Sequence, residues 1–276
     1  MITISAFADE IDPDLDAQMD VLSRQGVRFI DVRGIDNINI ASMSLQQARQ
    51  YHQRMKDKGF HVPSLGSPIG KIRIDQDFQQ HLELLRHCCD LARAFGTREI
   101  RVFSFYASKG KKIEDQRAQV MDRLAGMVDL ARQEDGLLWL ENERDLYGWS
   151  PQGMLDIFAT LRSPHLKCLF DPANFVYDGI APYNQAWTKG LGDLTGYFHI
   201  KDKHPDQPHC CPAGRGHGQI PEILADLKNR NWSGVMTVEP HMTRAEQFTG
   251  FTGPDLFGEA VQALKDLLDQ AALAYQ

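Results

Sequence analysis

The sequence contains no apolar run of about eighteen residues, the length that a membrane-spanning helix requires. Its first ten residues, MITISAFADE, lack the basic start and long apolar stretch of a secretory signal peptide. The five cysteines are odd in number and show no CxxC spacing, which favours reduced thiols over a disulfide framework. These absences predict a cytoplasmic protein that has no membrane partner.

Basic residues are also in the minority. The chain has 30 Lys and Arg against 37 Asp and Glu, a formal charge of −7, which argues against a nucleic acid as the main partner. A hydrophobic content of 42% with 24% charged residues is typical of a soluble globular protein and is compatible with a small-molecule substrate. Linkers, low-complexity segments and tandem repeats are missing, so we predict one domain over residues 1–276.

Short apolar runs alternate with amphipathic stretches eight times along the chain. The runs are Ile2 to Phe7, Phe29 to Arg33, His61 to Leu65, Ile100 to Phe105, Leu137 to Leu140, Leu166 to Phe170, Gly196 to Ile200 and Val235 to Val238. Strict alternation predicts an α/β fold with a parallel sheet covered by helices. Eight units in this length favour a closed (β/α)₈ TIM barrel, and no GxGxxG follows the first run to favour a nucleotide-binding sheet.

Several helix starts can be read directly from the residues. Asp12-Pro13 and Ser150-Pro151 both place a capping residue before a first-turn proline. Ser44 and Gln47 have the spacing of a capping box. A last helix is predicted from about Leu256 to Leu273. These signals predict helices that begin just after the loops at the ends of the apolar runs.

Four of the apolar runs lead into one ionisable residue each, namely Glu141, Asp171, His199 and Glu239. Consecutive members are 30, 28 and 40 positions apart, close to one βα unit each. In a barrel of this kind the active site lies at the carboxyl ends of the strands, so we expect the four side chains to converge there. Carboxylates and imidazole are ligands for divalent cations, and the set therefore predicts one metal ion per chain.

A mostly oxygen site of this type suits manganese, with magnesium and zinc as alternatives. Such a cation can bind two neighbouring oxygens of a sugar and stabilise the negative charge of an enediolate. Glu141 and Glu239 could then remove and return a proton beside the carbonyl, while neutral His199 serves as a ligand. The predicted activity is that of a sugar or keto-sugar isomerase or epimerase, with Glu141 and Glu239 as the catalytic pair.

The segments LENE, FDPANF, HIKD and VEPH, in this order on a (β/α)₈ pattern, resemble the xylose-isomerase-like TIM-barrel superfamily. Within it the chain is similar to ketose 3-epimerases, inosose dehydratases and sugar phosphate isomerases. The resemblance implies that Glu141 and Glu239 are both metal ligands and proton-transfer residues, and that Asp171 and His199 are ligands alone. It also implies a small-molecule sugar substrate and a homo-oligomer as a candidate assembly.

Two positions depart from the pattern of ketose epimerases and bear on the substrate. Where those enzymes carry a histidine three residues after the aspartate, this chain has Asn174, and where they carry an arginine six residues after the histidine it has Pro205. Asn174 is therefore a predicted substrate contact that differs from the family. The resemblance makes Lys201 and Asp202 pocket residues too, although Asp202 could instead cap a turn.

The remaining candidate substrate contacts come from loops. Arg33 ends the second apolar run and could grip substrate oxygens or form a rim salt bridge. Lys71, in the loop after the third run, could reach a carboxylate or phosphate or remain a solvated lysine. Arg215 and His217 lie in the glycine-rich loop Gly214 to Gly218, which could hold a phosphate but more simply turns the chain.

Three other readings of the same residues stay open. Endonuclease IV belongs to the same superfamily but needs three zinc ions and further histidines, whereas the ends of the second, third and fourth runs offer Arg33, Gly66 and Ser104. An inosose-dehydratase-like lyase would use the same metal site, because its first step is the same proton removal. A barrel that binds sugar without catalysis is the third alternative, although all four ionisable positions are intact.

Overall fold

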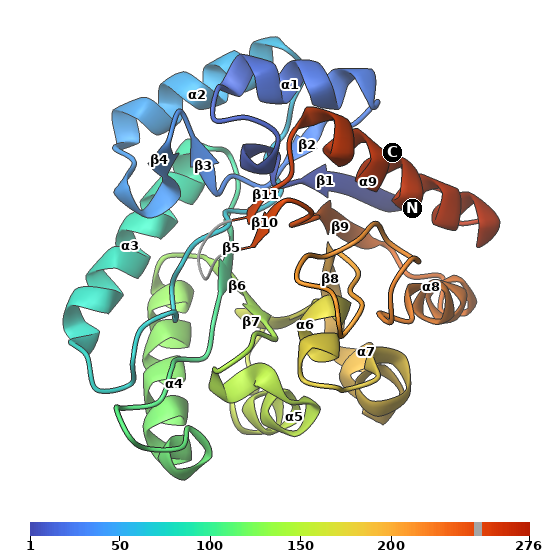
Figure 1. Ribbon diagram of the computed structural model, residues 1–276. Coiled ribbons are helices and arrows are strands. Elements are labelled where there is room, and N and C mark those ends of the chain that lie inside the picture. Colours follow the sequence, from blue (N-terminus) through green and yellow to red (C-terminus); the bar gives the residue numbers. More distant parts are fainter. Residues whose placement is uncertain (246–249) are drawn as a thin grey trace.

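The fold is organised around a curled sheet, and the structure, a computed structural model, describes residues 1–245 and 250–276. Within these residues the sheet has seven strands in the order β2-β1-β9-β8-β7-β6-β5. They are β1 (Ile2–Ala6), β2 (Phe29–Ile30), β5 (Glu99–Val102), β6 (Leu137–Glu141), β7 (Leu166–Phe170), β8 (Thr195–Ile200) and β9 (Gly234–Val238). All neighbouring pairs are parallel, so the carboxyl ends of the strands share one end of the sheet (Figure 1).

The predicted third strand, residues 61–65, is not a strand in the structure. The segment lies between β2 and β5 and forms only isolated parallel bridges, from His61 to Phe29 and from Leu65 to Val32 and Ile100. Pro63 has no N–H to donate, which prevents a continuous ladder. The second and fourth strands are shorter than predicted, since β2 and β5 end at residues 30 and 102.

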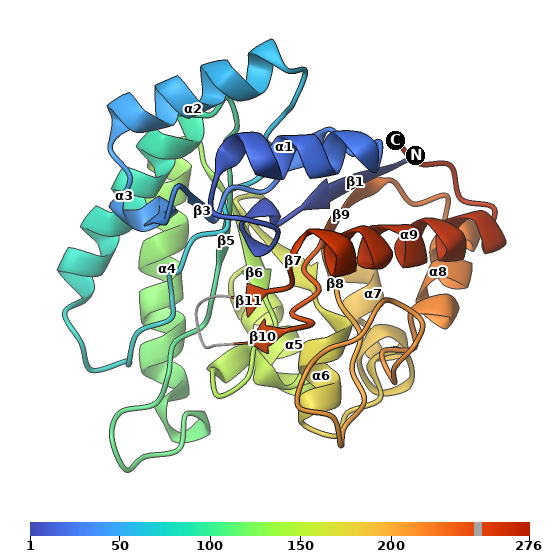
Figure 2. The same cartoon turned by 45° about the horizontal axis from the view of Figure 1, so that its top comes forward.

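Helices surround the sheet in Figure 1. They are α1 (Leu15–Arg24), α2 (Leu45–Asp57), α3 (Phe78–Ala94), α4 (Arg117–Gln133), α5 (Pro151–Thr160), α6 (Pro172–Tyr177), α7 (Leu191–Leu194), α8 (Ile220–Asn229) and α9 (Pro254–Gln270), with the short turns η1 (Ala8–Glu10), η2 (Ile40–Ser42), η3 (Glu114–Gln116), η4 (Tyr147–Trp149), η5 (Pro182–Ala186) and η6 (Trp187–Lys189). Two small hairpins pair β3 (Gly34–Ile35) with β4 (Ile38–Asn39) and β10 (Arg244–Ala245) with β11 (Gly250–Phe251). The termini lie side by side (Figure 2), because the Ile2 N–H donates to the Ala274 carbonyl at 2.8 Å.

Two of the three predicted helix starts are confirmed. Ser44 and Gln47 form the expected capping box of α2, and Ser150 caps α5 ahead of a proline in the first turn. The prediction for Asp12-Pro13 is wrong, because Asp14 caps α1 by accepting the Ala17 N–H at 2.8 Å. Asp12 instead accepts the Asp14 N–H, so the proline lies in a turn before the helix.

The apolar core lies between the sheet and the helices. Helix α4, for example, buries Val120, Leu124, Met127 and Ala131, whose spacing places them on one face of the helix. All five cysteines are free thiols, and four of them are buried. Among residues 1–245 and 250–276, no helix is both long enough and apolar enough to span a membrane.

The loop between residue 65 and α3 is fastened by a buried histidine. Gly70 adopts φ +94°, and a Cβ there would lie 2.0 Å from the Phe103 carbonyl oxygen, so only glycine fits. The Gly70 N–H donates to Nε2 of His81 at 2.8 Å. Burial, together with the smaller effect of the Arg123 charge, lowers the pKa of His81 to about 4. The histidine is therefore neutral in the fold and holds the loop that carries Lys71.

The lowered pKa of His81 predicts that the fold loses stability in acid. The pKa of His81 is about 4 in the fold against 6.5 for the ordinary side chain, so its contribution is complete above pH 6.5 and is lost as the pH falls through 4. We expect this residue to account for up to about 3 kcal/mol of the acid destabilisation. Urea unfolding of wild type and His81→Gln at pH 7 and pH 4.5 measures it, because glutamine accepts the same hydrogen bond without titrating. Equal pH dependence in the two proteins would contradict the prediction.

Candidate metal centre

The structure brings together the four ionisable residues that end adjacent strands. Glu141 is the last residue of β6, and Asp171 directly follows β7. His199 is the second-last residue of β8, and Glu239 directly follows β9. Each offers one possible ligand atom, and these four atoms all lie within 4.8 Å of one another. All four residues are buried, so they form one group of metal-compatible atoms enclosed by protein.

Several of these atoms have no hydrogen-bond partner. Oε2 of Glu141 and both ring nitrogens of His199 are buried without one. Nδ1 of His199 lies 3.1 Å from Oε1 of Glu141 and 3.4 Å from Oε2 of Glu239, but no hydrogen bond forms. Buried polar atoms without partners are rare because each costs free energy. A cation among them would satisfy lone pairs that the protein leaves unused, so the residues fit a metal ion.

The four side chains perturb one another's ionisation strongly. Burial raises the pKa of Glu141, but the neighbouring His199 and Arg101 together outweigh it, and the pKa falls to about 2. Burial raises the pKa of Asp171 to about 7 despite the opposing charge of Lys201. Burial lowers the pKa of His199, yet Glu141 and Glu239 raise it to about 9. For Glu239 the charges of Lys201, His241 and His199 together overcome burial and hold the pKa well below its usual range.

Two predicted substrate contacts, Arg33 and Lys201, form ion pairs with this group. Arg33 is buried, and its Nη1 lies 2.9 Å from Glu239 while its Nε lies 2.8 Å from Asp9. Nζ of Lys201 lies 2.8 Å from Glu239 and 2.5 Å from Asp171. Both oxygens of Glu239 therefore face a cation. Whether Arg33 and Lys201 also touch substrate stays a prediction.

Arg101 is a further buried cation that the sequence did not single out. Its Nη1 lies 3.5 Å from Glu141, and its guanidinium stacks on the rings of Phe7 and Phe103 at 5.0 and 4.8 Å from their centres. It comes from the middle of an apolar run, where nothing in the pattern separates it from a strand residue facing solvent. Ring stacking and burial show that it faces the interior.

The ion-paired cluster has more carboxylates than cations. Its members are the carboxylates Asp9, Glu10, Glu141, Asp171 and Glu239 and the cations Arg33, Arg101 and Lys201. In a metal-bound state His199 must be neutral, because a protonated imidazole cannot bind a cation, and the five carboxylates then face three Lys and Arg cations. Unbalanced buried charge is costly. One divalent cation would bring this cluster to neutrality.

Asn174 and Lys71 each make a defined contact at the same end of the sheet. The Asn174 side-chain amide donates to Oε1 of Glu141 at 3.2 Å, and its backbone N–H donates to Asp171 at 3.2 Å. Asn174 therefore holds two of the four residues in place. Nζ of Lys71 lies 2.8 Å from Glu143, so it joins two neighbouring loops through a largely buried ion pair. A substrate contact by either residue stays a prediction.

Asp202 accepts hydrogen bonds from the glycine-rich loop. This contact corresponds to the alternative role of Asp202, capping a turn, that the sequence left open. Its carboxylate accepts the backbone N–H groups of residues 203, 214, 216 and 218 at 2.7 to 3.0 Å. A Cβ on Gly216 would lie 2.3 Å from the carboxylate. With four donors on its two oxygens, Asp202 serves the loop, and we leave it out of the proposed substrate site.

Replacing this anchor should destabilise the fold without removing the metal ligands. We expect Asp202→Ala to lower the free energy of unfolding by about 3 kcal/mol, because buried N–H groups lose their acceptor. Asp202→Asn should lose less, since one oxygen acceptor remains. Urea unfolding measures both, with metal affinity followed by calorimetry. Wild-type stability in the alanine variant would contradict the anchoring role.

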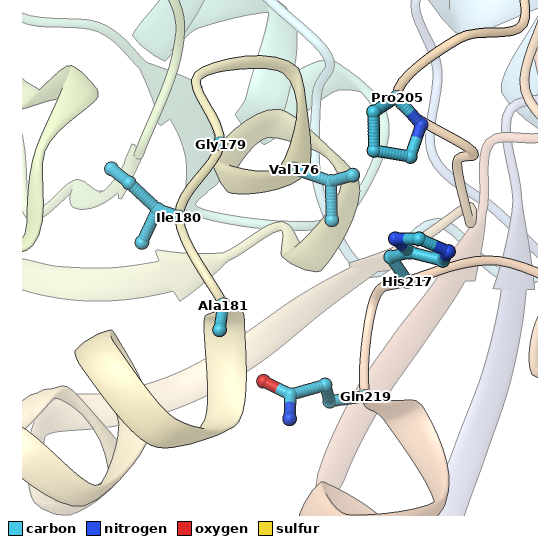
Figure 3. Close-up of a pocket in the computed structure, with 7 residues that line it drawn as sticks. All are labelled: Val176, Gly179, Ile180, Ala181, Pro205, His217 and Gln219. Carbon is cyan, nitrogen blue, oxygen red and sulfur yellow. The ribbon is translucent and has the colours of Figure 1, made fainter.

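The two other predicted contacts of this loop lie at the surface. Arg215 is 59% exposed and pairs with Glu259 of α9, so we leave it out of the proposed site. His217 is exposed and lines a pocket of about 320 Å³ with Val176, Pro205 and Gln219 (Figure 3). The pocket lies between the end of α6 and the loop after β8. His217 therefore faces a cavity, and its role in substrate binding stays a prediction.

A second group of possible ligands adjoins the first. Nδ1 of His241 lies 2.7 Å from Glu10, and its Nε2 lies 3.6 Å from Glu239. Burial would raise the pKa of Glu10, but the charges of His241 and Arg33 lower it. His241 could have been found from the sequence, because it lies in the VEPH segment. Glu10 follows β1 in a short helical turn, where an acidic residue attracts no notice.

A curled parallel sheet with carboxylates and an imidazole at the carboxyl ends of adjacent strands is the arrangement of a TIM-barrel protein with a candidate metal site. The chain belongs to the xylose isomerase-like TIM barrel family, whose sequence model matches residues 19–267. No curated protein sequence matches it.

Solved structures share this fold along nearly the whole chain. The probable 3-DHS dehydratase AsbF from Bacillus anthracis is 16% identical over 95% of this chain and 98% of its own, with a TM-score of 0.75. An L-ribulose 3-epimerase is 16% identical over 98% and 95%, with a TM-score of 0.73. The IOLI protein with a bound zinc atom is 16% identical over 98% and 97%, also with a TM-score of 0.73. At these identities the likeness shows the fold alone.

Proposed function

We propose that the chain is a divalent-metal-dependent isomerase or epimerase of keto-sugars. The observation that carries the proposal is the convergence of Glu141, Asp171, His199 and Glu239, whose possible ligand atoms lie within 4.8 Å of one another. Support also comes from the family, whose structural relatives include an epimerase, and from the relative described with zinc. The proposal includes one domain over residues 1–276 built as a closed (β/α)₈ barrel, in which segment 61–65, through its isolated bridges, takes the place of the third strand between β2 and β5.

The metal ion would be held by Glu141, Asp171, His199 and Glu239. Three carboxylates and one imidazole form a mostly oxygen site, which suits manganese, with magnesium and zinc as alternatives. When bound, the cation would polarise the substrate carbonyl and stabilise the negative charge that develops on the enediolate oxygens. One ion per chain is expected, because Arg33, Gly66 and Ser104 follow β2, segment 61–65 and β5, where a three-zinc nuclease would need ligands.

Proton transfer falls to the two glutamates. Glu141 or Glu239 removes the proton from the carbon beside the carbonyl, and the other returns it, which isomerises or epimerises the sugar. Glu239 is held at both oxygens by Arg33 and Lys201, so its position is fixed. Glu141 receives one hydrogen bond from Asn174 at Oε1, while its Oε2 has no hydrogen-bond partner and lies 3.5 Å from Nη1 of Arg101.

A dehydratase is the second candidate, favoured by the dehydratase among the structural relatives. It would start with the same proton removal and then lose a hydroxyl group. The same residues in the same arrangement would serve either reaction, so only the identity of the product distinguishes them.

Proton NMR in deuterated water tests the proposal. We expect manganese-loaded protein to introduce solvent deuterium beside the carbonyl of a keto-sugar while its formula stays otherwise unchanged. Loss of water would show the dehydratase. Metal-loaded protein that exchanges no deuterium with any of a panel of ketoses and inososes would refute both candidates. Metal analysis of the same sample checks the expected single ion per chain.

A further inference from the structure

Asp31 is a buried carboxylate that lies outside the ion-paired cluster of the metal centre. It directly follows β2 and is 3% exposed. The interior of a TIM barrel is usually filled by branched apolar side chains, and a buried carboxylate costs free energy unless polar partners replace the water it loses. The partners of this carboxylate among the described residues are hydroxyl groups.

Three hydroxyl groups from three different strands meet at Asp31. Ser5 of β1 donates to Oδ1 at 2.8 Å, and Thr237 of β9 donates to Oδ2 at 3.0 Å. The hydroxyl of Tyr197, on β8, lies 2.8 and 2.7 Å from the two oxygens. Burial raises the pKa of Asp31 to about 6, against the hydrogen bond from Tyr197 and the charge of His199. At pH 7.5 the carboxylate is therefore ionised and can accept from all three hydroxyls.

The curl of the sheet makes these contacts possible. In the sheet, β1 and β9 separate β2 from β8 (Figure 1). Neighbouring strands lie about 4.8 Å apart, so a flat sheet would hold the backbones of Asp31 and Tyr197 about 14 Å apart. Side chains stand roughly perpendicular to a sheet, and these two can meet only on its concave side. Asp31 therefore joins four consecutive strands from inside the curl.

Two of the three hydroxyl residues lie directly beneath candidate metal ligands. Tyr197 comes two residues before His199 on β8, and Thr237 comes two residues before Glu239. Side chains two positions apart point to the same face of a strand and are about 7 Å apart along it. Asp31 and its hydroxyl partners thus form the layer beneath His199 and Glu239.

The imidazole ring of His199 is held by packing. Its Nδ1 lies 3.1 Å from Glu141 and 3.4 Å from Glu239, so Nε2 is the second nitrogen. Metal-binding histidines usually donate the second N–H to a partner that fixes the ring, but Nε2 has no hydrogen-bond partner in the described part of the chain. Two rings pack nearly perpendicular to the imidazole, Tyr197 with centres 6.3 Å apart and Phe7 with centres 4.9 Å apart. The orientation of His199 therefore depends on where these two rings lie.

We propose that Asp31 is a positioning residue of the metal centre, which holds Tyr197 against the ring of His199 and ties β8 to β9 beneath the ligand atoms. The inference rests on the metal site of the proposed function and adds a residue that acts through Tyr197 and Thr237. A tyrosine fastened at its hydroxyl end keeps one rotamer, so His199 keeps the orientation in which Nδ1 faces the other ligands. Without Asp31, the buried hydroxyls lose their common acceptor and the Tyr197 ring can move.

Calorimetric titration with manganese at pH 7.5 tests the proposal. Tyr197→Phe keeps the ring but loses the hydrogen bond to Asp31, and we expect it to weaken binding about tenfold. Asp31→Ala should weaken binding about 30-fold, whereas Asp31→Asn, which keeps one oxygen to accept from Tyr197, should lose about threefold. Visible absorption of the cobalt-loaded protein gives a second readout, because a reoriented ligand shifts the bands.

The matched control is Tyr51→Phe. The Tyr51 hydroxyl, on α2, also donates to a carboxylate, that of Asp36, at 2.8 Å, and the residue is buried. Loss of this hydrogen bond should leave manganese affinity and the cobalt bands as in wild type. Urea unfolding confirms that each variant is folded under the conditions of the titration, and Tyr197→Phe decides the question even if Asp31→Ala does not fold.

His199→Ala is the reference for the metal site itself. If this variant binds manganese as tightly as wild type, the metal centre is refuted and the proposed function with it. If it binds weakly while Tyr197→Phe keeps wild-type affinity and wild-type cobalt bands, only the positioning role of Asp31 is overturned. Equal losses in Asp31→Asn and Asp31→Ala would also overturn that role, because the charge of Asp31 alone would then explain the effect.

Discussion

Glu239→Gln is expected to lower kcat for the isomerisation or epimerisation about 10³-fold, because the amide can neither remove nor return a proton at the reacting carbon. The variant keeps the shape of the side chain and one oxygen that can still face the metal. The substitution removes the negative charge of Glu239. Arg33 and Lys201, which lie 2.9 and 2.8 Å from this carboxylate in the wild-type structure, then have less counter-charge. The measurement is steady-state turnover at saturating manganese, with metal content determined on the same sample.

Glu141→Gln separates the two halves of the proton transfer. Glu141→Gln and Glu239→Gln should both lose product formation. The variant in which the glutamate that removes the proton is intact should still exchange deuterium from the solvent into the substrate. Glu83→Gln, on the exposed face of α3, makes the same chemical change away from the site and should behave as wild type. Wild-type turnover in Glu239→Gln after thorough chelation and reloading would sink the acid-base assignment.

Asp171→Asn is expected to weaken manganese binding about 100-fold. A neutral amide replaces a charged ligand, and Lys201, 2.5 Å from Asp171, gains uncompensated positive charge that repels the metal. The fold should survive, because Asp171 also caps α6 by accepting the Asn174 N–H, and asparagine is an equally good cap. Calorimetric titration with manganese measures the affinity.

The control for this variant is Asp129→Asn, on an exposed position of α4, which should bind manganese as wild type does. Turnover by Asp171→Asn should recover in part at high manganese, since the two glutamates are intact. An unchanged affinity would mean that Asp171 is no ligand. Activity that stays lost at saturating metal would give Asp171 a part in the chemistry itself.

Much of the sheet could be read from the residues because a strand covered on both faces must be apolar throughout. The runs that became β1, β6, β7, β8 and β9 were found for that reason, nearly with their observed ends. Segment 61–65, HVPSL, is less apolar than these runs and carries Pro63, which removes one ladder hydrogen bond. The apolar residues of the segment can be read from the sequence. The effect of the N–H that Pro63 lacks depends on which strands lie beside the segment in the fold.

The candidate site was partly readable for a related reason. A carboxylate at the end of a buried apolar run can be accommodated only where the strand emerges, so Glu141 and Glu239 stood out. Arg101 and Glu10 did not, because one lies within an apolar run and the other in a polar turn. Their place beside the metal centre depends on strand order and on how the sheet curls.

The sequence by itself determined which residues can meet at the carboxyl ends of the strands, since the apolar runs have the spacing of one βα unit and a fixed direction. Only the tertiary structure decided what those residues meet. It made Lys201 and Arg33 partners of Glu239 and turned Asp202 into the anchor of its own loop. An ion pair forms only when two charged atoms lie within a few ångströms of each other. Here these atoms come from segments far apart in the chain, so no local sequence pattern predicts their distance.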